Sequence, residues 1–338
     1  MLSIAELDAQ LSDPSPALLE DISRIKGDFL VLGAGGKMGP SLALLLRRAL
    51  MAAGSAQKVF AVSRFSNPDA RALLEASGIL TISADLLDEA DLAALPQAEN
   101  VLYMAGMKFG SSGNQPLTWA MNSYLPGRVA ESFKNSRIVV FSTGNIYPFT
   151  PATSGGPDET TPPQPIGEYA QSCLGRERIF EYFSIKNHTP MLIYRLNYAI
   201  DMRYGVLLDV AKSVFNGQPI DLSMGHVNVI WQGDANEIAI RALRHCDDPP
   251  MILNVTGPET ISVRWLAEKF GEYFDRQPVF TGEPQPTALL NNASRSHRLF
   301  GYPRVSLRQM IEWTASWVQA GGAELGKPTH FQQRKGNF

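Results

Sequence analysis

At 338 residues, with 44% hydrophobic and 19% charged residues, the chain is long enough to bury a complete core without disulfide or metal staples. A net charge of −3 gives no reason to expect a nucleic acid or an anionic membrane as a partner. Two cysteines cannot form a disulfide framework, no apolar run approaches the ~20 residues of a membrane span, and no signal-peptide pattern precedes the first strand, so we expect a cytoplasmic protein.

The first 27 residues precede the first strand. Ser3 is placed to cap a helix that runs to Leu11, and Ser15 followed by Pro16 is typical of the start of a second helix. We expect this N-terminal helical extension to pack against the body or to contribute to a dimer.

A glycine-rich turn follows the buried strand expected over residues 28–32. Gly33, Gly36 and Gly39 recur at intervals of three, and an apolar helical pattern over 37–53 begins within the turn. A strand, such a turn and a helix N-terminus together form a seat for a pyrophosphate, because backbone N–H groups and the helix dipole attract an anion. The turn therefore predicts nucleotide binding, with the residues between the three glycines also in contact: Gly35, Lys37 and Met38.

The next two strands, expected over 58–62 and 79–83, end in polar residues. In a dinucleotide fold an acidic residue after the second strand binds the adenosine ribose, whereas an arginine accommodates a 2′-phosphate. Ser63 and Arg64 occupy this place, which favours NADP over NAD, although Arg64 could be a solvated loop charge. Asp85, followed by Leu86, is placed to reach the adenine or to cap the next helix.

Three further strands are expected over 100–104, 137–141 and 191–196, each apolar on both faces and separated by helices. This alternation predicts an α/β fold with a doubly wound parallel sheet covered on both sides. Ligands bind at the carboxyl ends of such strands. The residues that follow them are the candidates: Ala105, Gly106 and Lys108 after the first of the three, Thr143 and Asn145 after the second, and Asn197 after the third.

The later part of the chain changes character. Helices are expected over 205–216, 234–245 and 263–274, with a strand over 251–255 that returns to the sheet. Proline- and glycine-rich connections and short helices follow, which predicts a smaller lobe over the carboxyl edge of the sheet. The histidines are scattered without the spacing of metal ligands, so we expect no metal.

Seven short motifs occur in a familiar order. They are Gly33-x-x-Gly36-x-x-Gly39, Asp85-Leu86, Ala105-Gly106, Asn122, Ser142-Thr143-x-x-Ile146-Tyr147, Tyr169-x-x-x-Cys173-x-x-x-Glu177, and Arg195 with Asn197. In this order they resemble the extended short-chain dehydrogenases/reductases, the NAD-dependent epimerase/dehydratase family, over roughly residues 28–320. The resemblance implies a Rossmann domain that binds NADP or NAD, with Asn122 and Tyr169 among the cofactor contacts, a C-terminal substrate lobe, and a homodimer.

The expected division has three parts. An N-terminal extension covers residues 1–27, the dinucleotide-binding domain covers 28–200 and 226–256, and the substrate lobe covers 201–225 and 257–330. The resemblance places Lys108, Thr143, Asn145, Asn197 and His226 on the substrate side.

The catalytic pair of the family is a tyrosine and a lysine four residues later, on one helix face. The ammonium lowers the tyrosine pKa and binds the nicotinamide ribose, while a serine or threonine orients the substrate oxygen. Here Thr143 and Tyr169 occupy their places, but Cys173 stands where the lysine belongs. A neutral thiol cannot supply the positive charge, and a thiolate would raise the tyrosine pKa.

Three explanations for Cys173 stay open. Another cation substitutes, with Lys108 as first choice and Arg176 as second; Tyr169 acts as a neutral acid or orienting donor; or the protein binds the dinucleotide without turnover, as a sensor or scaffold. A nucleophilic or redox-active Cys173 is disfavoured, because nothing in the sequence around it lowers a thiol pKa. The leading hypothesis is an oxidoreductase or epimerase/dehydratase acting on a sugar-like hydroxyl or keto substrate, whether a nucleotide sugar, a free sugar or a sugar acid.

Overall fold

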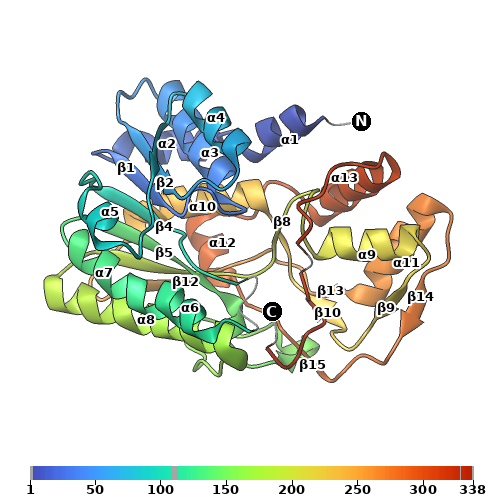
Figure 1. Cartoon of the computed structure of the whole chain (residues 1–338). Coiled ribbons are helices and arrows are strands. Elements are labelled where there is room, and N and C mark those ends of the chain that lie inside the picture. The colour runs from blue at the N-terminus through green and yellow to red at the C-terminus, as the bar shows by residue number, and fades with distance from the viewer. Residues whose placement is uncertain (1–2, 109–112, 328, 337–338) are drawn as a thin grey trace.

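A single parallel sheet forms the centre of the molecule (Figure 1). The computed structural model describes residues 3–108, 113–327 and 329–336. The strand order is β12-β7-β5-β4-β1-β2-β3, with every neighbouring pair parallel. The strands are β1 (Phe29–Leu32), β2 (Val59–Ser63), β3 (Leu80–Ser83), β4 (Asn100–Tyr103), β5 (Arg137–Thr143), β7 (Met191–Leu196) and β12 (Met251–Val255). The predicted α/β fold with a doubly wound sheet is confirmed.

Helices cover both faces of this sheet because its strands are apolar on both sides. In β1, Phe29 and Val31 join one core cluster, whereas Leu30 and Leu32 join the other. The first cluster is closed by α2 (Pro16–Arg24), α3 (Gly39–Ala52) and α10 (Gln232–Arg241). The second is closed by α5 (Glu89–Ala93), α7 (Leu125–Ser132) and α8 (Gly167–Asn187). The helix α4 (Pro68–Ala76) joins β2 to β3.

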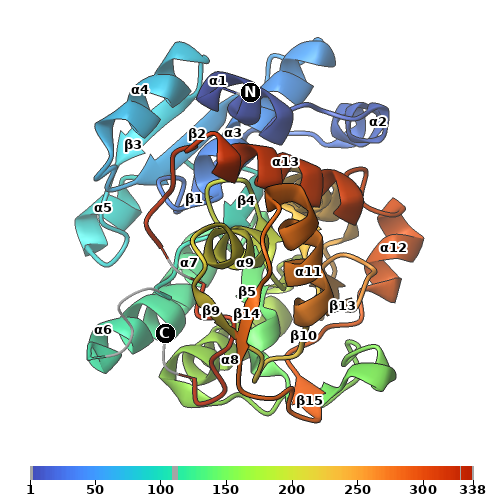
Figure 2. The ribbon, with the colours of Figure 1, turned by 90° about the vertical axis from the view of Figure 1, so that its right-hand side faces the viewer.

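A smaller lobe with its own core lies beside the carboxyl edge of the sheet (Figures 1 and 2). Its helices are α9 (Val206–Phe215), α11 (Val263–Phe274) and α13 (Leu307–Gln319). Short strand pairs complete it: β9 (Pro219–Asp221) with β14 (Val279–Thr281), and β10 (His226–Val227) with β13 (Ile261–Ser262). Two more pairs join it to the body: β8 (Ala199–Ile200) with β11 (Ile230–Trp231), and β6 (Thr150–Pro151) with β15 (Thr287–Ala288).

The N-terminal extension packs against both parts. The helix α1 (Ile4–Leu11) begins at the expected Ser3 cap and buries Leu7 and Leu11 in the lobe core. The following helix, capped by Ser15, buries its apolar side chains against the sheet. The extension therefore bridges the two bodies.

In the later part of the chain, the two hydrophobic cores do not follow the domain boundaries expected from the sequence. Val227 and Trp231, expected in the dinucleotide-binding domain, are buried in the lobe core. Conversely, α12 (Ser294–Phe300), expected in the lobe, packs beside β12, and Phe300 contacts the core of the sheet. The chain crosses between the two bodies more often than a simple two-part division requires.

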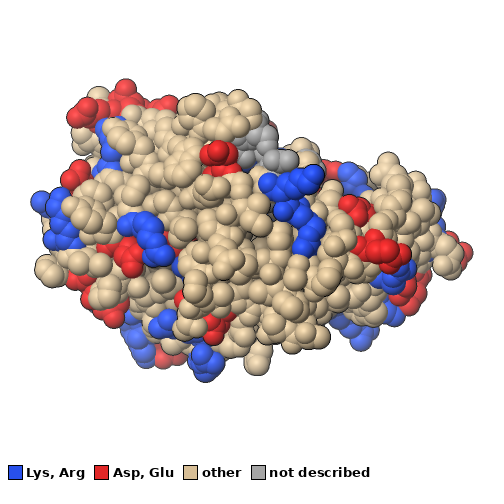
Figure 3. Space-filling model, turned by 90° about the horizontal axis from the view of Figure 1, so that it is seen from below, with Lys and Arg blue, Asp and Glu red and all other residues tan. Residues whose placement is uncertain are grey.

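The surface in Figure 3 mixes charges of both signs. Lys and Arg side chains lie among Asp and Glu side chains around the edge of this face, and its middle carries few charges. A stripe of basic residues, the electrostatic mark of a nucleic-acid track, is absent from the described residues of this face.

A buried ion pair fixes the helix α8 to the sheet. Glu177 in α8 faces Arg195 in β7 at 2.8 Å, with both side chains at most 3% exposed. Arg195 also donates to the Tyr147 hydroxyl, and the Ser142 hydroxyl donates to Glu177. Because Tyr169 is carried by the same helix, this pair sets its position relative to the strand ends.

Removing one partner of this pair should destabilise the fold strongly. We expect Arg195→Met to lower the free energy of unfolding by about 3–5 kcal/mol, because Glu177 is left as an uncompensated buried charge. Denaturant unfolding measures this change. The matched control is Arg308→Ala, which breaks an exposed helical pair with Glu312 and should leave the unfolding midpoint unchanged. Equal midpoints for both variants would contradict the structural role of the buried pair.

Candidate functional site

The site lies at β1, where the order in which the chain adds strands to the sheet reverses. The chain leaves β1 for β2 on one side, while β4 lies on the other, so a crevice opens between the carboxyl ends of β1 and β4. Gly33 has a φ of +91°, and a Cβ placed there would lie 2.7 Å from the backbone nitrogen of Ala105. The absence of a side chain at Gly33 therefore lets the two loops meet at the mouth of the crevice.

Two cavities adjoin at this turn. They share Gly33, Gly36 and Met104 in their walls. The first, of about 210 Å³, brings the residues expected beside the adenosine, Ser63, Arg64, Asp85 and Leu86, together with Gly35 of the turn and with Ala105 and Gly106 after β4. The second, of about 240 Å³, brings Lys108, Thr143, Asn145, Tyr169 and Asn197 together with Lys37, Met38 and Gly39 of the turn. The geometry suits one long ligand that passes over the glycine turn.

The first cavity is framed by two opposite charges. The guanidinium of Arg64 is 73% exposed and lies 4.0 Å from the Asp85 carboxylate. Asp85 also accepts a hydrogen bond from the backbone N–H of Leu87, whereas Asp88 is the residue that caps α5. Asp85 thus keeps a carboxylate at the wall of this cavity, with its partner at the rim.

The second cavity holds the phenol of Tyr169. Burial raises the pKa of Tyr169 well above its ordinary value, and the neighbouring Cys173 raises it further. The positive charge of Arg176 and a hydrogen bond with Thr143 act in the opposite direction and lower this pKa. The phenol is therefore neutral near pH 7, and it shares a hydrogen bond with the hydroxyl expected to orient a substrate oxygen.

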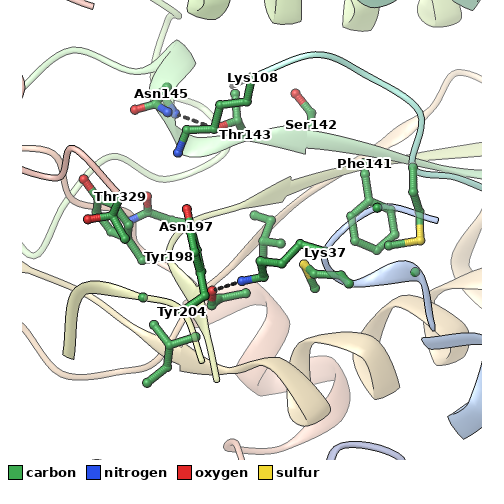
Figure 4. Close-up of a pocket in the computed structure, with 18 of the residues that line it drawn as sticks. Lys37, Lys108, Phe141, Ser142, Thr143, Asn145, Asn197, Tyr198, Tyr204 and Thr329 are labelled. Atoms are coloured by element: carbon green, nitrogen blue, oxygen red, sulfur yellow. Dashed lines mark hydrogen bonds between the residues drawn. The ribbon is translucent and has the colours of Figure 1, made fainter. Parts of the chain in front are cut away.

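Two amines enter the same cavity from different elements (Figure 4). The Lys37 Nζ donates to the carbonyl of Ala199 at 2.7 Å and lies 4.0 Å from the centre of the Tyr204 ring. The Lys108 Nζ lies 6.0 Å from the centre of the Tyr169 ring. Burial lowers the pKa of Lys37 to about 7 and that of Lys108 to about 8. No Asp or Glu is among the described residues that line this cavity.

Cys173 and Arg176 lie behind the cavity wall. The Cys173 thiol is fully buried, and burial raises its pKa. Arg176 donates to the Phe141 carbonyl at 2.7 Å and to the Asn122 Oδ1 at 2.6 Å. Arg176 thus brings a positive charge near Tyr169, while both terminal nitrogens of its guanidinium are engaged with the protein.

Asn122 has a structural position that the sequence did not indicate. It lies in a π-helix, η1 (Ala120–Tyr124), between α6 (Gln115–Trp119) and α7. Its amide accepts from the Met107 N–H and donates to the Met107 carbonyl and to Ser172. Asn122, expected to contact the cofactor, does not line either cavity, because its polar atoms hold the loop that precedes Lys108.

The substrate-side candidates separate into two groups. Asn197 is 4% exposed, lines the second cavity, and its Nδ2 has no hydrogen-bond partner among the described residues. Asn145 and Lys108 line the same cavity. His226, expected to join them, lies outside the walls of both cavities because β10 pairs with β13 in the lobe.

Other wall residues of the second cavity escaped the sequence analysis. Tyr198 follows β7 with a φ of +43°, Tyr204 precedes α9, and Thr329 comes from the far end of the chain. No local pattern marks these residues, since only the tertiary fold brings them to the cavity.

The comparisons with known proteins agree with this architecture. The model of the NAD dependent epimerase/dehydratase family matches residues 29–200. The chain belongs to this family. No curated protein matches the chain.

Several solved structures share the fold. A UDP-glucuronic acid 4-epimerase from Bacillus cereus in complex with NAD has a TM-score of 0.72 at 18% identity, and the match covers 87% of this chain and 99% of the epimerase. MoeE5 in complex with UDP-glucose and NAD has a TM-score of 0.69 at 18% identity, with the same coverage. The complex of Thermus thermophilus UDP-glucose 4-epimerase with NAD has a TM-score of 0.70 at 19% identity, covering 86% of this chain and 99% of that one. At these identities the likeness extends to the fold.

Within the described residues, no helix is both long and apolar enough to span a bilayer. Nor do the described residues include a group of three or more His, Cys, Asp and Glu placed to hold a metal ion.

Cys173 should be chemically silent in the folded protein. Because its pKa is raised, less thiolate is present at pH 8 than for an ordinary cysteine, and burial blocks access. We expect alkylation at pH 8 to proceed only as fast as the protein unfolds, with peptide mass spectrometry locating the label. Unfolding in guanidinium is the control, in which Cys173 and Cys246 should both react. Rapid, stoichiometric labelling of native Cys173 would instead support a nucleophilic or redox role.

Proposed function

We propose that this protein binds a nicotinamide dinucleotide in the crevice and catalyses proton and hydride transfer on a carbohydrate-like substrate, as an epimerase/dehydratase or a dehydrogenase. The observation that carries the proposal is the convergence of Tyr169, Thr143 and Lys108 on one cavity that opens from the glycine turn. Membership of the NAD dependent epimerase/dehydratase family supports it.

The pyrophosphate of the cofactor fits the glycine turn. The helix α3 begins there with no side chain capping its N-terminus, so its first N–H groups face the crevice. The adenosine then occupies the cavity of Ser63, Arg64 and Asp85, and the nicotinamide occupies the cavity of Tyr169.

We propose NAD as the cofactor, although the sequence alone favoured NADP. A 2′-phosphate held by Arg64 would also approach the Asp85 carboxylate, which lies 4.0 Å from the guanidinium and would repel it. The three structural neighbours were all solved with NAD.

The electrostatic role and the binding role of the missing lysine are assigned to two different residues. Arg176 supplies the positive charge that lowers the Tyr169 pKa, but both of its terminal nitrogens donate to the protein. Lys108 supplies an amine that reaches the cavity itself. In this arrangement Thr143 orients the substrate oxygen and Lys108 binds a substrate or ribose hydroxyl. Tyr169 transfers the proton: its phenolate form, favoured by the Arg176 charge, accepts the proton of a substrate hydroxyl, and its neutral form donates a proton to a keto oxygen. The bound cofactor supplies the hydride acceptor.

The second candidate is a dinucleotide-binding sensor without turnover. The observation that favours it is the pKa of Tyr169, which stays well above its ordinary value although the charge of Arg176 lowers it. This candidate predicts tight cofactor binding and no hydride exchange with any sugar.

A homodimer through the helices α7 and α8 is part of the proposal. Large apolar side chains stand exposed on this side of the molecule, namely Tyr124 at 62%, Tyr182 at 58% and Ile185 at 52%. A second copy covering them would form a helix bundle, the mode of association expected for the family.

Calorimetric titration with NAD⁺ and with NADP⁺ tests the cofactor assignment. We expect micromolar affinity for NAD⁺ and weaker binding of NADP⁺, because Asp85 stands beside the 2′ position. Arg64→Ala should leave NAD⁺ affinity nearly unchanged; Arg24→Ala, on the exposed face of α2, is the control. A preference for NADP⁺ that Arg64→Ala abolishes would restore the expectation from the sequence. Failure to bind either dinucleotide would overturn the proposed function.

Replacing the phenol tests the chemistry. With a substrate found by screening sugars, sugar acids and nucleotide sugars for cofactor reduction, Tyr169→Phe should lower kcat by about 10²–10⁴-fold, the usual contribution of a positioned acid or base. Cofactor affinity should change little. Tyr302→Phe, at an exposed position outside both cavities, is the matched control. Turnover that survives Tyr169→Phe would remove the role assigned here.

A further inference from the structure

The C-terminal segment, residues 329–336, crosses the substrate end of the site. Thr329 lines the cavity, and its N–H and hydroxyl both donate to the Asp209 carboxylate of α9, at 3.0 and 2.5 Å. Phe331 is buried in the lobe core. Arg334 donates to the carbonyl and the hydroxyl of Thr287, at 2.8 and 2.6 Å. The segment is therefore anchored along most of its described length.

The far end of this segment reaches the helix that carries the candidate catalytic phenol. A Cβ placed on Gly336 would lie 2.8 Å from the Cα of Gly167, the first residue of α8 and two positions before Tyr169. Figures 1 and 2 show the C-terminal end lying between the sheet and the lobe. The segment thus contacts both the lobe and the start of α8, which lie on either side of the site.

The same segment separates two cavities. Thr329 faces the cavity of Tyr169, of about 240 Å³. Residues 330–332 line a separate outer cavity, of about 300 Å³, which continues along α9 toward β9. Asp209 and Lys212 of α9 line that outer cavity as well. Removing the segment would take Thr329 from the wall of the inner cavity and residues 330–332 from the wall of the outer one.

The inner cavity is small for a site that takes both a substrate and part of a cofactor. Pockets for drug-sized ligands usually measure roughly 300–1,000 Å³, and this one must also receive the reacting end of the cofactor. MoeE5 was solved with UDP-glucose and NAD together, and its match covers 99% of that chain but only 87% of this one. A diphosphate directed outward from Tyr169 would meet Thr329 and then the carboxylate of Asp209.

We propose that residues 329–336 determine substrate size: they close the outer end of the site, so that the substrate is a free sugar or sugar acid without a nucleoside diphosphate. The inference rests on the proposed function, because it names the substrate class of that site. Asn197, Asn145 and Thr143 supply the polar contacts that suit a small polyhydroxylated ligand, and the unpartnered Nδ2 of Asn197 provides a donor for it.

Titration with UDP and with UDP-glucose tests this inference. The intact chain should give no measurable binding, whereas a chain ending at residue 327 should bind both. We expect an increase in affinity of roughly tenfold or more, because a segment that is closed most of the time lowers apparent affinity by its open fraction. In a screen for cofactor reduction, the intact chain should use free sugars or sugar acids and no nucleotide sugar.

A second variant keeps the test decisive if the shortened chain fails to fold. Arg334→Ala removes the bonds to Thr287 but leaves Phe331 in the lobe core, so it should loosen the segment and raise UDP affinity in a folded protein. Lys335→Ala, at the exposed neighbouring position, is the matched control and should behave as the intact chain.

Three results would overturn the inference: micromolar binding of UDP-glucose by the intact chain, equal UDP affinity with and without the segment, or no UDP binding by either variant. None of these titrations requires cofactor or turnover. A failure of the proposed function, seen as absent dinucleotide binding, is therefore distinguishable from a failure of this inference.

Discussion

The buried guanidinium of Arg176 constrains the whole reacting end of the site. A charge removed from water must be surrounded by hydrogen-bond acceptors, and here the Phe141 carbonyl of β5 and the Asn122 side chain provide them. A Cβ on Gly106 would lie 3.1 Å from the Arg176 Cζ, so only glycine fits at position 106, in the loop that follows β4. The π-helix η1 places the Asn122 side chain beside this charge. Through its hydrogen bonds to Met107, Asn122 also orders the loop that leads to Lys108.

Arg176 also explains how the helix can lack a lysine at position 173. Residues seven apart on a helix lie on nearly the same face, so the charge of Arg176 remains near Tyr169 although it is one turn further away. The cost of this position is that the guanidinium lies behind the wall and cannot touch a ligand. A cation on a loop, Lys108, faces the cavity instead, and the electrostatic and binding roles of one lysine fall to two residues from distant parts of the chain.

The sequence predicted those features whose causes are local. The glycine turn requires particular backbone angles and missing side chains within seven residues, and the strands are short apolar runs, so both could be identified from the sequence. The two-residue strands of the lobe, the π-helix and the contacts of Asn122 depend on partners far away in the chain. His226 failed as a candidate for the same reason: its segment was expected to belong to the dinucleotide-binding domain, but it pairs within the lobe. Thr329 had no signal at all, because its place follows from the path of the last segment.

The residues that line this cavity carry unfavourable free-energy contributions that a bound ligand would relieve. Burying an amine lowers its pKa, so the folded state holds the Lys37 and Lys108 protons less tightly than the unfolded chain does, and this burial works against folding. Asp201 and Asp209 offset the loss at Lys37 and Lys108 only in part, and Asn197 leaves a buried donor unused. An anionic or hydroxyl-rich ligand would reverse each of these costs at once, by raising both lysine pKa values and accepting from Asn197. Since these costs fall on the turn after β1, the loop after β4 and the end of β7, one ligand that bridges them would relieve all of them at the carboxyl edge of the sheet.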